Sequence, residues 1–214
     1  MFNSCDVLSN RNDEGIITYE ITYPKPIADK SMEKLMPKEM DVQFKGGHLK
    51  TELSFGYGMI NIAYLSNHKK KELNEMLVFL KKGKFATRDQ ASITEMMKSI
   101  PPHKITPGNA TKMIAGYTCK NAIIEVRDDT TSYDFECWYT EELGDPEINW
   151  CSPFSPIKGM LMEYQIERLD VAMKFTASQV KLIQIPDEEF SIPDGYKKIS
   201  CEKMKENLQE LKEI

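Results

Sequence analysis

Apolar and polar residues alternate with a period of two along most of the chain. The first such stretch places its apolar residues two positions apart, at Ile17, Tyr19, Ile21 and Tyr23. This alternation is typical of a half-buried β-strand. Strands are also predicted in five further stretches, Met40–Phe44, Leu49–Phe55, Met59–Leu65, Leu73–Leu80 and Phe85–Asp89. Because Gly46-Gly47 and other short polar turns join these stretches, the first half predicts a meander of antiparallel strands.

The second half continues the same pattern. Three segments read as extended and as consecutive strands of one antiparallel sheet, namely 114–122, 137–143 and 157–164. Two of them belong to a predicted hairpin, whose arms are 111–126 and 132–141 around Arg127–Thr130. The third segment belongs to a strand predicted over 158–169, and further strands are predicted at 171–175 and 179–185.

Helical spacing of apolar residues occurs in only three places. A short helix is predicted over 31–36, before Pro37. Another is predicted over 92–99, where Ile93, Met96 and Met97 recur at helical spacing and Pro101 ends the helix. Ser200 is suited to cap a terminal helix over 200–211.

The predicted fold class is mainly β. An antiparallel sheet of about ten strands rarely stays flat, because strand twist makes it curl, split or close. We therefore expect a curled antiparallel sheet, a half-barrel, with short helices in its mouth and a C-terminal helix. The chain has no internal repeat or shift in composition, so residues 15–214 are predicted to form a single domain after a flexible, polar N-terminal tether over residues 1–14.

Composition narrows the function classes. The 214 residues are 41% hydrophobic and 29% charged, values typical of a soluble globular protein. A net charge of −5 and the lack of a basic stripe disfavour nucleic acid as a partner. No apolar run approaches the roughly 20 residues that span a bilayer. Contact with a membrane is therefore expected only through a lipid anchor.

The cysteines raise the question of that anchor. Cys5 follows the small residue Ser4, as in a processed lipoprotein signal, although an ordinary terminus with an incidental cysteine fits equally well. Five cysteines is an odd number, and acylation of Cys5 would leave four. Cys119 and Cys137 lie on the two arms of the predicted hairpin. A disulfide joins them if the turn is centred near Asp128, whereas a different register leaves two buried thiols.

Signals for catalysis or metal binding are weak. The three histidines, His48, His68 and His103, are isolated from one another and from carboxylates at ligand spacing. No hydrolase, phosphate-loop or dinucleotide motif occurs. The acidic runs Asp128-Asp129 and 187–189 suit calcium less well than they suit solvated turns. The neighbours Glu141 and Glu142 would point to opposite faces of a strand. We predict no enzyme activity, no catalytic residue, no metal site and no cofactor.

Methionine is abundant, with 13 residues. It is flexible and fills irregular space, so it suits a cavity for variable apolar ligands, although a plain packed core gives the same pattern. On strands 158–169 and 171–175, Glu163 and Lys174 alternate with apolar residues that we expect on the interior side. The candidate ligand-binding residues are Met96, Met97, Met113, Met160, Met162, Tyr164, Met173 and Phe175.

The order of three motifs resembles the GLPGLI family and its relatives of unknown function, envelope proteins of Bacteroidetes-type bacteria. The first motif is Gly116-Tyr117 followed by Cys119-Lys120, and the second is Trp138-Tyr139-Thr140. The third is Pro156-Ile157 followed by Gly159-Met160-Leu161, interrupted by Lys158. The segment 190–196 also resembles the tail of those relatives. The resemblance covers roughly residues 110–200.

The resemblance implies a curled sheet similar to that of periplasmic lipoprotein carriers, and it implies export, but no reaction. Two hypotheses follow for a protein of the periplasm or an outer-membrane lipoprotein. In the first, it is a cell-envelope binding module that holds an apolar ligand or lipid chain in the half-barrel. In the second, it is an envelope interaction or structural protein with a filled core, which contacts another envelope protein through an exposed aromatic loop containing Trp150 and Phe154.

Overall fold

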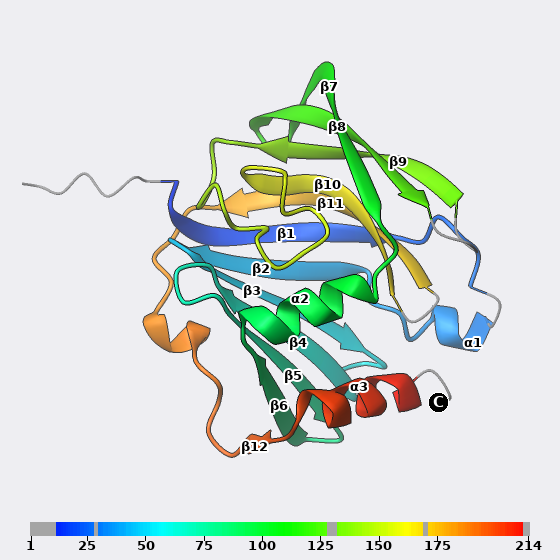
Figure 1. Ribbon diagram of the computed structural model, residues 1–214, viewed down its shortest axis with the longest axis vertical. Coiled ribbons are helices and arrows are strands. Elements are labelled where there is room, and N and C mark those ends of the chain that lie inside the picture. The colour runs from blue at the N-terminus through cyan, green and yellow to red at the C-terminus, as the bar shows by residue number, and fades with distance from the viewer. Residues whose placement is uncertain (1–11, 28–29, 128–131, 169–170, 212–214) are drawn as a thin grey trace, which may run out of the picture.

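The computed structural model describes residues 12–27, 30–127, 132–168 and 171–211, and one large sheet dominates it (Figure 1). Of the described residues, 53% lie in strands and 14% in helices, so the protein is mainly β. The sheet is not closed into a barrel. Its strands are β1 (Glu14–Thr22), β2 (Glu39–Lys45), β3 (His48–Phe55), β4 (Ile60–Asn67), β5 (Glu72–Phe79), β6 (Lys82–Arg88), β7 (His103–Ile114), β8 (Tyr117–Arg127), β9 (Ser132–Thr140), β10 (Met160–Arg168), β11 (Val171–Lys181) and β12 (Lys197–Lys198).

The strand order follows from two meanders. It runs β12-β6-β5-β4-β3-β2-β1-β11-β10-β9-β8-β7, so β1 to β6 are sequential neighbours and so are β7 to β11. The pairing of β1 with β11 joins the two meanders. Every pairing is antiparallel except that of β12 with β6. The three segments whose order carried the family resemblance lie on or beside the adjacent strands β8, β9 and β10, as predicted for one antiparallel sheet.

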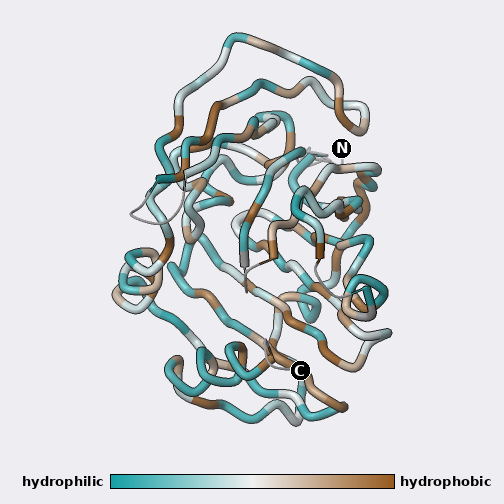
Figure 2. The backbone as a smooth tube through the Cα atoms, turned by 90° about the vertical axis from the view of Figure 1, so that its right-hand side faces the viewer, coloured by the Kyte–Doolittle hydropathy of each residue, from teal (hydrophilic) through white to brown (hydrophobic). Residues whose placement is uncertain are grey.

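The sheet buries both of its faces, in different ways. Ile62 and Leu77 are opposite each other on β4 and β5 and pack against Met204 of α3 (Cys201–Glu210). We call this side the inner face; α2 (Gln90–Lys98), α3 and the loop 141–159 lie over it in Figure 1. Ala63 and Met76 point the other way, onto the outer face. Hydrophilic and hydrophobic residues alternate along the strands in Figure 2, consistent with their two-residue period.

The three predicted helices are present. They are a single turn, α1 (Lys30–Glu33), and the longer α2 and α3. The Asp89 side chain caps α2 by accepting from the Ser92 N–H at 2.9 Å, and Ser200 caps α3 by accepting from the Lys203 N–H at 3.2 Å. Both are ordinary N-caps. Within the described residues, no helix combines the length and hydropathy needed to cross a membrane.

Two strand boundaries differ from those predicted. The arm 111–126 is two strands, because Ala115 and Gly116 take positive φ values of 47° and 88° and turn the chain back. The resulting β7 passes through Pro107, which lacks a backbone donor but is tolerated on an edge strand. The strands predicted at 171–175 and 179–185 form one continuous β11, which ends at Lys181.

The chain enters the fold before the predicted domain boundary at residue 15. The Asp13 carbonyl accepts from the Gly46 N–H at 2.9 Å, and the Asn12 carbonyl accepts from the Gly144 N–H at 2.9 Å. Most of the predicted tether, residues 1–11 with Cys5, lies outside the described residues.

Of the two alternatives for Cys119 and Cys137, the structure has two free, buried thiols and not the disulfide. The register pairs Ala122 with Cys137 and Asn121 with Trp138. Because side chains alternate along a strand, Cys119 lies on the same face of the sheet as Asn121 and Trp138, whereas Cys137 lies on the opposite face. The disulfide required a hairpin centred near Asp128, whereas Arg127 pairs with Ser132 and the centre lies further along the chain.

Candidate functional site

Five of the eight predicted ligand-binding residues converge in the interior. Met160, Met162, Met173 and Phe175 are each at most 3% exposed and belong to one buried cluster. Tyr164 packs against this cluster, with its ring stacked on Phe175 at 5.0 Å between centroids. Such close burial describes packed side chains, as in an ordinary protein core.

The other three predicted ligand-binding residues lie outside this buried cluster. Met96 and Met97 are half-buried on α2, and Met113 is 63% exposed near the end of the edge strand β7. Met113 is therefore turned to solvent and does not line the interior as a candidate ligand-binding residue.

The loop 141–159 is not the exposed aromatic surface that the sequence suggested. Phe154 is only 2% exposed and meets the Tyr164 ring edge-to-face at 5.9 Å. Trp150 is half-buried, with the Lys71 ammonium 4.9 Å from its ring centroid. The Asn149 side chain fixes the loop by donating to the carbonyls of Ile157 and Gly159 at 2.9 and 2.8 Å. The loop thus completes the core.

Two adjoining hollows open instead on the outer face. The larger has a volume of about 330 Å³ and is lined by Glu39, Met40, Asp41, Gln43, Lys50, Glu52 and Ser54. The smaller, of about 90 Å³, shares Lys50 and Glu52 with it and continues over Asn61, Ala63, Met76, Val78, Ser191, Pro193 and Tyr196. None of the eight predicted ligand-binding residues lines either hollow. We call the larger hollow the acidic groove.

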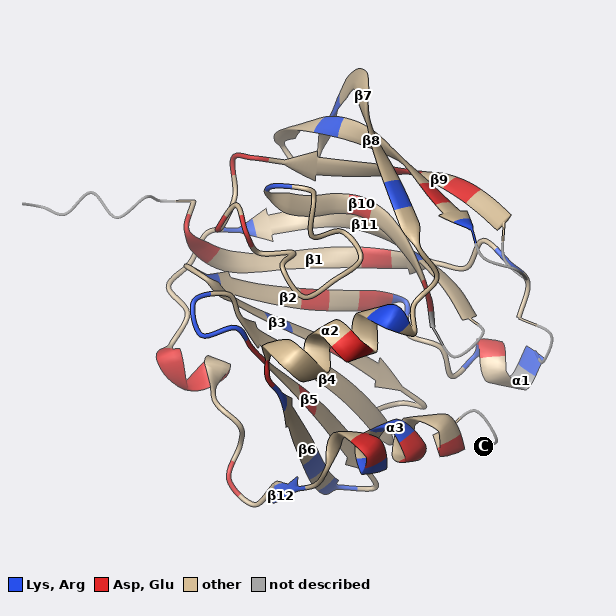
Figure 3. Ribbon diagram, in the orientation of Figure 1, with Lys and Arg blue, Asp and Glu red and all other residues tan. Residues whose placement is uncertain are grey.

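The carboxylates of the acidic groove face one another across strands. Asp41 on β2 is directly opposite Glu52 on β3, and Glu39 is directly opposite Glu20 on β1. Directly opposed like charges destabilise a sheet. Asp41 accepts a hydrogen bond from the Thr18 hydroxyl at 2.7 Å, but none of the four forms an ion pair with a described residue. Acidic positions gather on β1 and β2 in Figure 3.

The lysines of β2 and β3, Lys45 and Lys50, are paired with carboxylates of the segment 187–196, which we call the strap. It begins with a 3-10 turn, η1 (Asp187–Phe190). Lys50 lies in the acidic groove, but its ammonium donates to Glu189 at 2.7 Å. Lys45 likewise donates to Asp187 at 2.6 Å. Two of the three carboxylates in the acidic run 187–189 therefore form ion pairs and are not merely solvated.

The strap also packs through apolar contacts. Phe190, Ile192 and Tyr196 lie against the outer-face cluster of Ala63 and Met76. Burial, with a smaller effect from the charge of Glu52, raises the pKa of Tyr196 above its ordinary value. The strap thus covers the outer face over β4 to β6 and leaves the acidic groove over β2 and β3 open.

The acidic groove offers hydrogen-bond acceptors. Besides three carboxylates, it contains Gln43, whose side-chain oxygen is buried and has no hydrogen-bond partner among the described residues. A buried acceptor without a donor is costly, and a carboxylate accepts but does not donate. The arrangement suits a ligand group that is cationic and rich in N–H donors.

The histidines have local structural partners. His48 Nε2 is 3.2 Å from the Asn67 amide nitrogen, and burial lowers the pKa of His48. His68 Nδ1 lies 3.5 Å from Asp145, and His103 Nδ1 lies 2.7 Å from the Pro101 carbonyl oxygen. Within the described ranges, no group of three or more His, Cys, Asp or Glu residues is arranged to hold a metal ion.

The remaining acidic candidates are separated from one another. Glu141 pairs with Lys120 at 2.8 Å, whereas Glu142 accepts from the Thr118 N–H at 3.3 Å. Asp128 and Asp129 lie outside the described residues.

Comparison with known proteins adds no assignment. No protein-family model matches the chain, and no curated protein matches it either. The resemblance to the GLPGLI family therefore stays a prediction.

Proposed function

We propose that this protein is a non-catalytic interaction module that binds a basic polypeptide segment in the acidic groove. The observation that carries the proposal is the direct opposition of Asp41 and Glu52, with no cation paired to either among the described residues. A lysine or arginine side chain would relieve this repulsion and supply donors to Gln43. The packed state of Met162 and Phe175, each 0% exposed, supports an interaction protein with a filled core over a carrier of apolar ligands.

The groove has the geometry for an extended segment. Apart from Met40, its lining comes from alternate residues of two neighbouring strands, and the smaller hollow extends it across β4 and β5 to the strap. Small apolar residues, Ala63 and Val78, line that extension. We infer a segment with a basic residue over β2 and β3 followed by an apolar residue under the strap.

The test is calorimetric titration with a short peptide of alternating lysine and leucine. The wild type should bind it, with an affinity that falls as salt is raised, because exposed charges are screened. The double variant D41N/E52Q should bind at least about tenfold more weakly, equivalent to about 1.4 kcal/mol. Glu95→Gln, an exposed carboxylate on α2, is the matched control and should bind as the wild type does. Equal binding by the double variant would contradict the proposal.

We further propose that the module works in the cell envelope, on a sheet that curls into a half-barrel. The location is supported by Cys5 after Ser4 and by the resemblance in segments 116–120, 138–140 and 156–161. Metabolic labelling with a palmitate analogue tests it, since the wild type should be labelled and Cys5→Ala should not. Equal labelling of both proteins, or of neither, would remove that support.

A further inference from the structure

Two neighbouring turns at one end of the sheet expose four large apolar side chains. Tyr57 and Met59, between β3 and β4, are 89% and 48% exposed. Phe79 and Leu80, at the turn between β5 and β6, are 38% and 58% exposed. The Leu80 N–H donates to the Met59 carbonyl at 3.0 Å, so the two turns lie side by side. We call these four residues the apolar tip.

The backbone of the apolar tip is unfavourable for the residues that occupy it. Tyr57 has a φ of 56°, and Leu80 and Lys81 have φ values of 47° and 67°. Leu80-Lys81 is a two-residue hairpin loop with both φ values positive, as in a type I′ turn, where Asn-Gly is strongly preferred. Bulky side chains at such positions are strained, and strain of this kind concentrates at functional sites. Two adjacent turns thus use strained residues to present apolar side chains to solvent.

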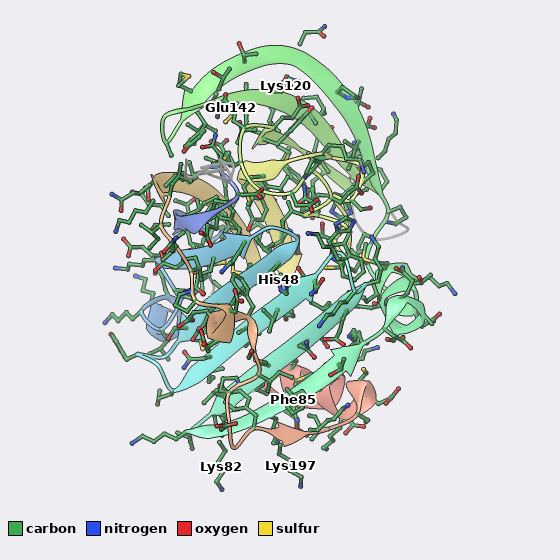
Figure 4. All side chains as sticks on the ribbon, turned by 90° about the vertical axis from the view of Figure 1, so that its left-hand side faces the viewer. His48, Lys82, Phe85, Lys120, Glu142 and Lys197 are labelled. Carbon is green, nitrogen blue, oxygen red and sulfur yellow. The ribbon has the colours of Figure 1, made fainter. Side chains whose placement is uncertain are left out.

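Lysines adjoin the apolar tip. Lys81 and Lys82 belong to the same turn, and Lys84 of β6 pairs with Lys197 of β12. Lys82 and Lys197 both lie at the lower edge of the sheet in Figure 4. Unlike Lys45 and Lys50, these four form no ion pair with any residue that the structure describes. Basic positions mark the lower end of β6 and β12 in Figure 3.

We propose that the apolar tip and these four lysines dock the protein onto an anionic phospholipid bilayer. Apolar side chains enter the boundary between headgroups and acyl chains, and flanking lysines are attracted to anionic headgroups. An aromatic residue such as Tyr57 suits the interface, where one end of its side chain stays wet. This contact is separate from the acidic groove and from acylation of Cys5, and it goes beyond the interaction function proposed above.

The test is co-sedimentation of the protein with vesicles. The wild type should bind vesicles of phosphatidylcholine mixed with phosphatidylglycerol and should bind pure phosphatidylcholine much more weakly. The variant L80N/K81G places Asn-Gly, the preferred pair of a type I′ turn, between β5 and β6. Its fold should therefore be at least as stable as that of the wild type. The variant loses one apolar and one basic contact, so its partition should fall about tenfold or more. Met113→Asn removes an equally exposed methionine elsewhere and should leave partition unchanged.

A second readout places the tip in the lipid. In Tyr57→Trp, the added indole should shift its fluorescence to the blue on mixed vesicles and not on phosphatidylcholine alone. Wild-type protein that stays in solution with mixed vesicles at low salt would overturn the proposal. Undiminished binding by folded L80N/K81G would also overturn it. Self-association of the wild type that this variant abolishes, without vesicle binding, would assign the tip to a second copy of the chain instead.

Discussion

Asp41 and Glu52 lie directly opposite each other on β2 and β3, and Lys50, which also lines their groove, pairs with Glu189 instead. Two unit charges 5 Å apart repel by about 0.8 kcal/mol even in bulk water. A sheet selected only for stability would place a lysine at one of the two positions. The arrangement is explained if the acidic groove has a cationic partner, because binding sites often lower the stability of the protein that carries them.

Reversing one charge should therefore stabilise the fold while removing the site. Glu52→Lys replaces a like-charge pair by an opposite-charge pair and should raise the free energy of unfolding by about 0.2–1 kcal/mol. Urea denaturation measures the change. Glu136→Lys is the control and should not stabilise the fold, since Glu136 lies on β9 opposite Ile123, and its replacement relieves no repulsion and removes the hydrogen bond that Glu136 accepts from Asn121 at 3.3 Å. A destabilised Glu52→Lys would show that the carboxylates do not repel in the folded state.

The strap should loosen in acid. Hydrogen bonds from Lys50 and Lys45 lower the pKa values of Glu189 and Asp187 below their ordinary values. A carboxyl group with a lowered folded-state pKa stabilises the fold at neutral pH, and that contribution is lost as pH falls through the lowered value. The variant K50M/E189Q should be at most about 1 kcal/mol less stable than the wild type at pH 7, because exposed ion pairs contribute little.

That difference should be smaller at about pH 3, below the ordinary carboxyl value, because the contribution of Glu189 is lost as pH falls toward and through its lowered pKa. Urea unfolding at the two pH values provides the measurement. A difference that persists undiminished in acid would mean that the substitutions act through packing and not through the ion pair.

The interior should behave as a packed core. Met162 is 0% exposed, so Met162→Trp should overpack its surroundings and cost about 1–3 kcal/mol of stability. The exposed Met113→Trp is the control and should cost little. If the interior holds an apolar ligand instead, Met162→Trp should leave stability intact and block binding of a fluorescent fatty acid. Thermal unfolding with a binding assay separates the two outcomes.

The buried thiols should resist modification. Burial raises the pKa of Cys137 to about 12 and that of Cys119 to about 11, and the thiolate is the reactive form. In the native protein at pH 8, both should react with a thiol reagent only as fast as the chain opens, and both should react at once in denaturant. A disulfide-linked peptide pair containing these residues in a non-reduced digest would contradict the register of β8 and β9.

Part of the acidic groove could be predicted from the sequence. The two-residue turn at Gly46-Gly47 pairs Lys45 with His48, and counting back along each arm then pairs Asp41 with Glu52. Because Met40 and Val42 alternate with charged residues, the sequence also predicts that Asp41 lies on the face of the sheet opposite to these two apolar residues. The opposed carboxylates were therefore predictable from one hairpin, although the abundant methionines pointed to the interior instead.

Other features depend on contacts that local patterns do not encode. The pairing of β1 with β11 joins residues about 150 to 165 positions apart in the chain, and the ion pairs of Lys45 and Lys50 with the strap join residues about 140 positions apart. The register of β8 and β9 pairs Ala122 with Cys137, whereas a hairpin centred near Asp128 would pair Cys119 with Cys137. The two registers differ by an odd number of residues, so Cys119 and Cys137 lie on opposite faces of the sheet. Whether Met162 lines a cavity or a packed core is decided by the loop 141–159, which fills the inner face.

The most direct test of the acidic groove is to map amide chemical shifts while the lysine–leucine peptide is added. Binding in the acidic groove predicts that the largest shifts fall on β2, β3 and the strap, with saturation at one site. The same titration of D41N/E52Q should leave those signals unmoved. Saturable shifts confined to the interior strands β10 and β11, or an identical response from the double variant, would contradict it.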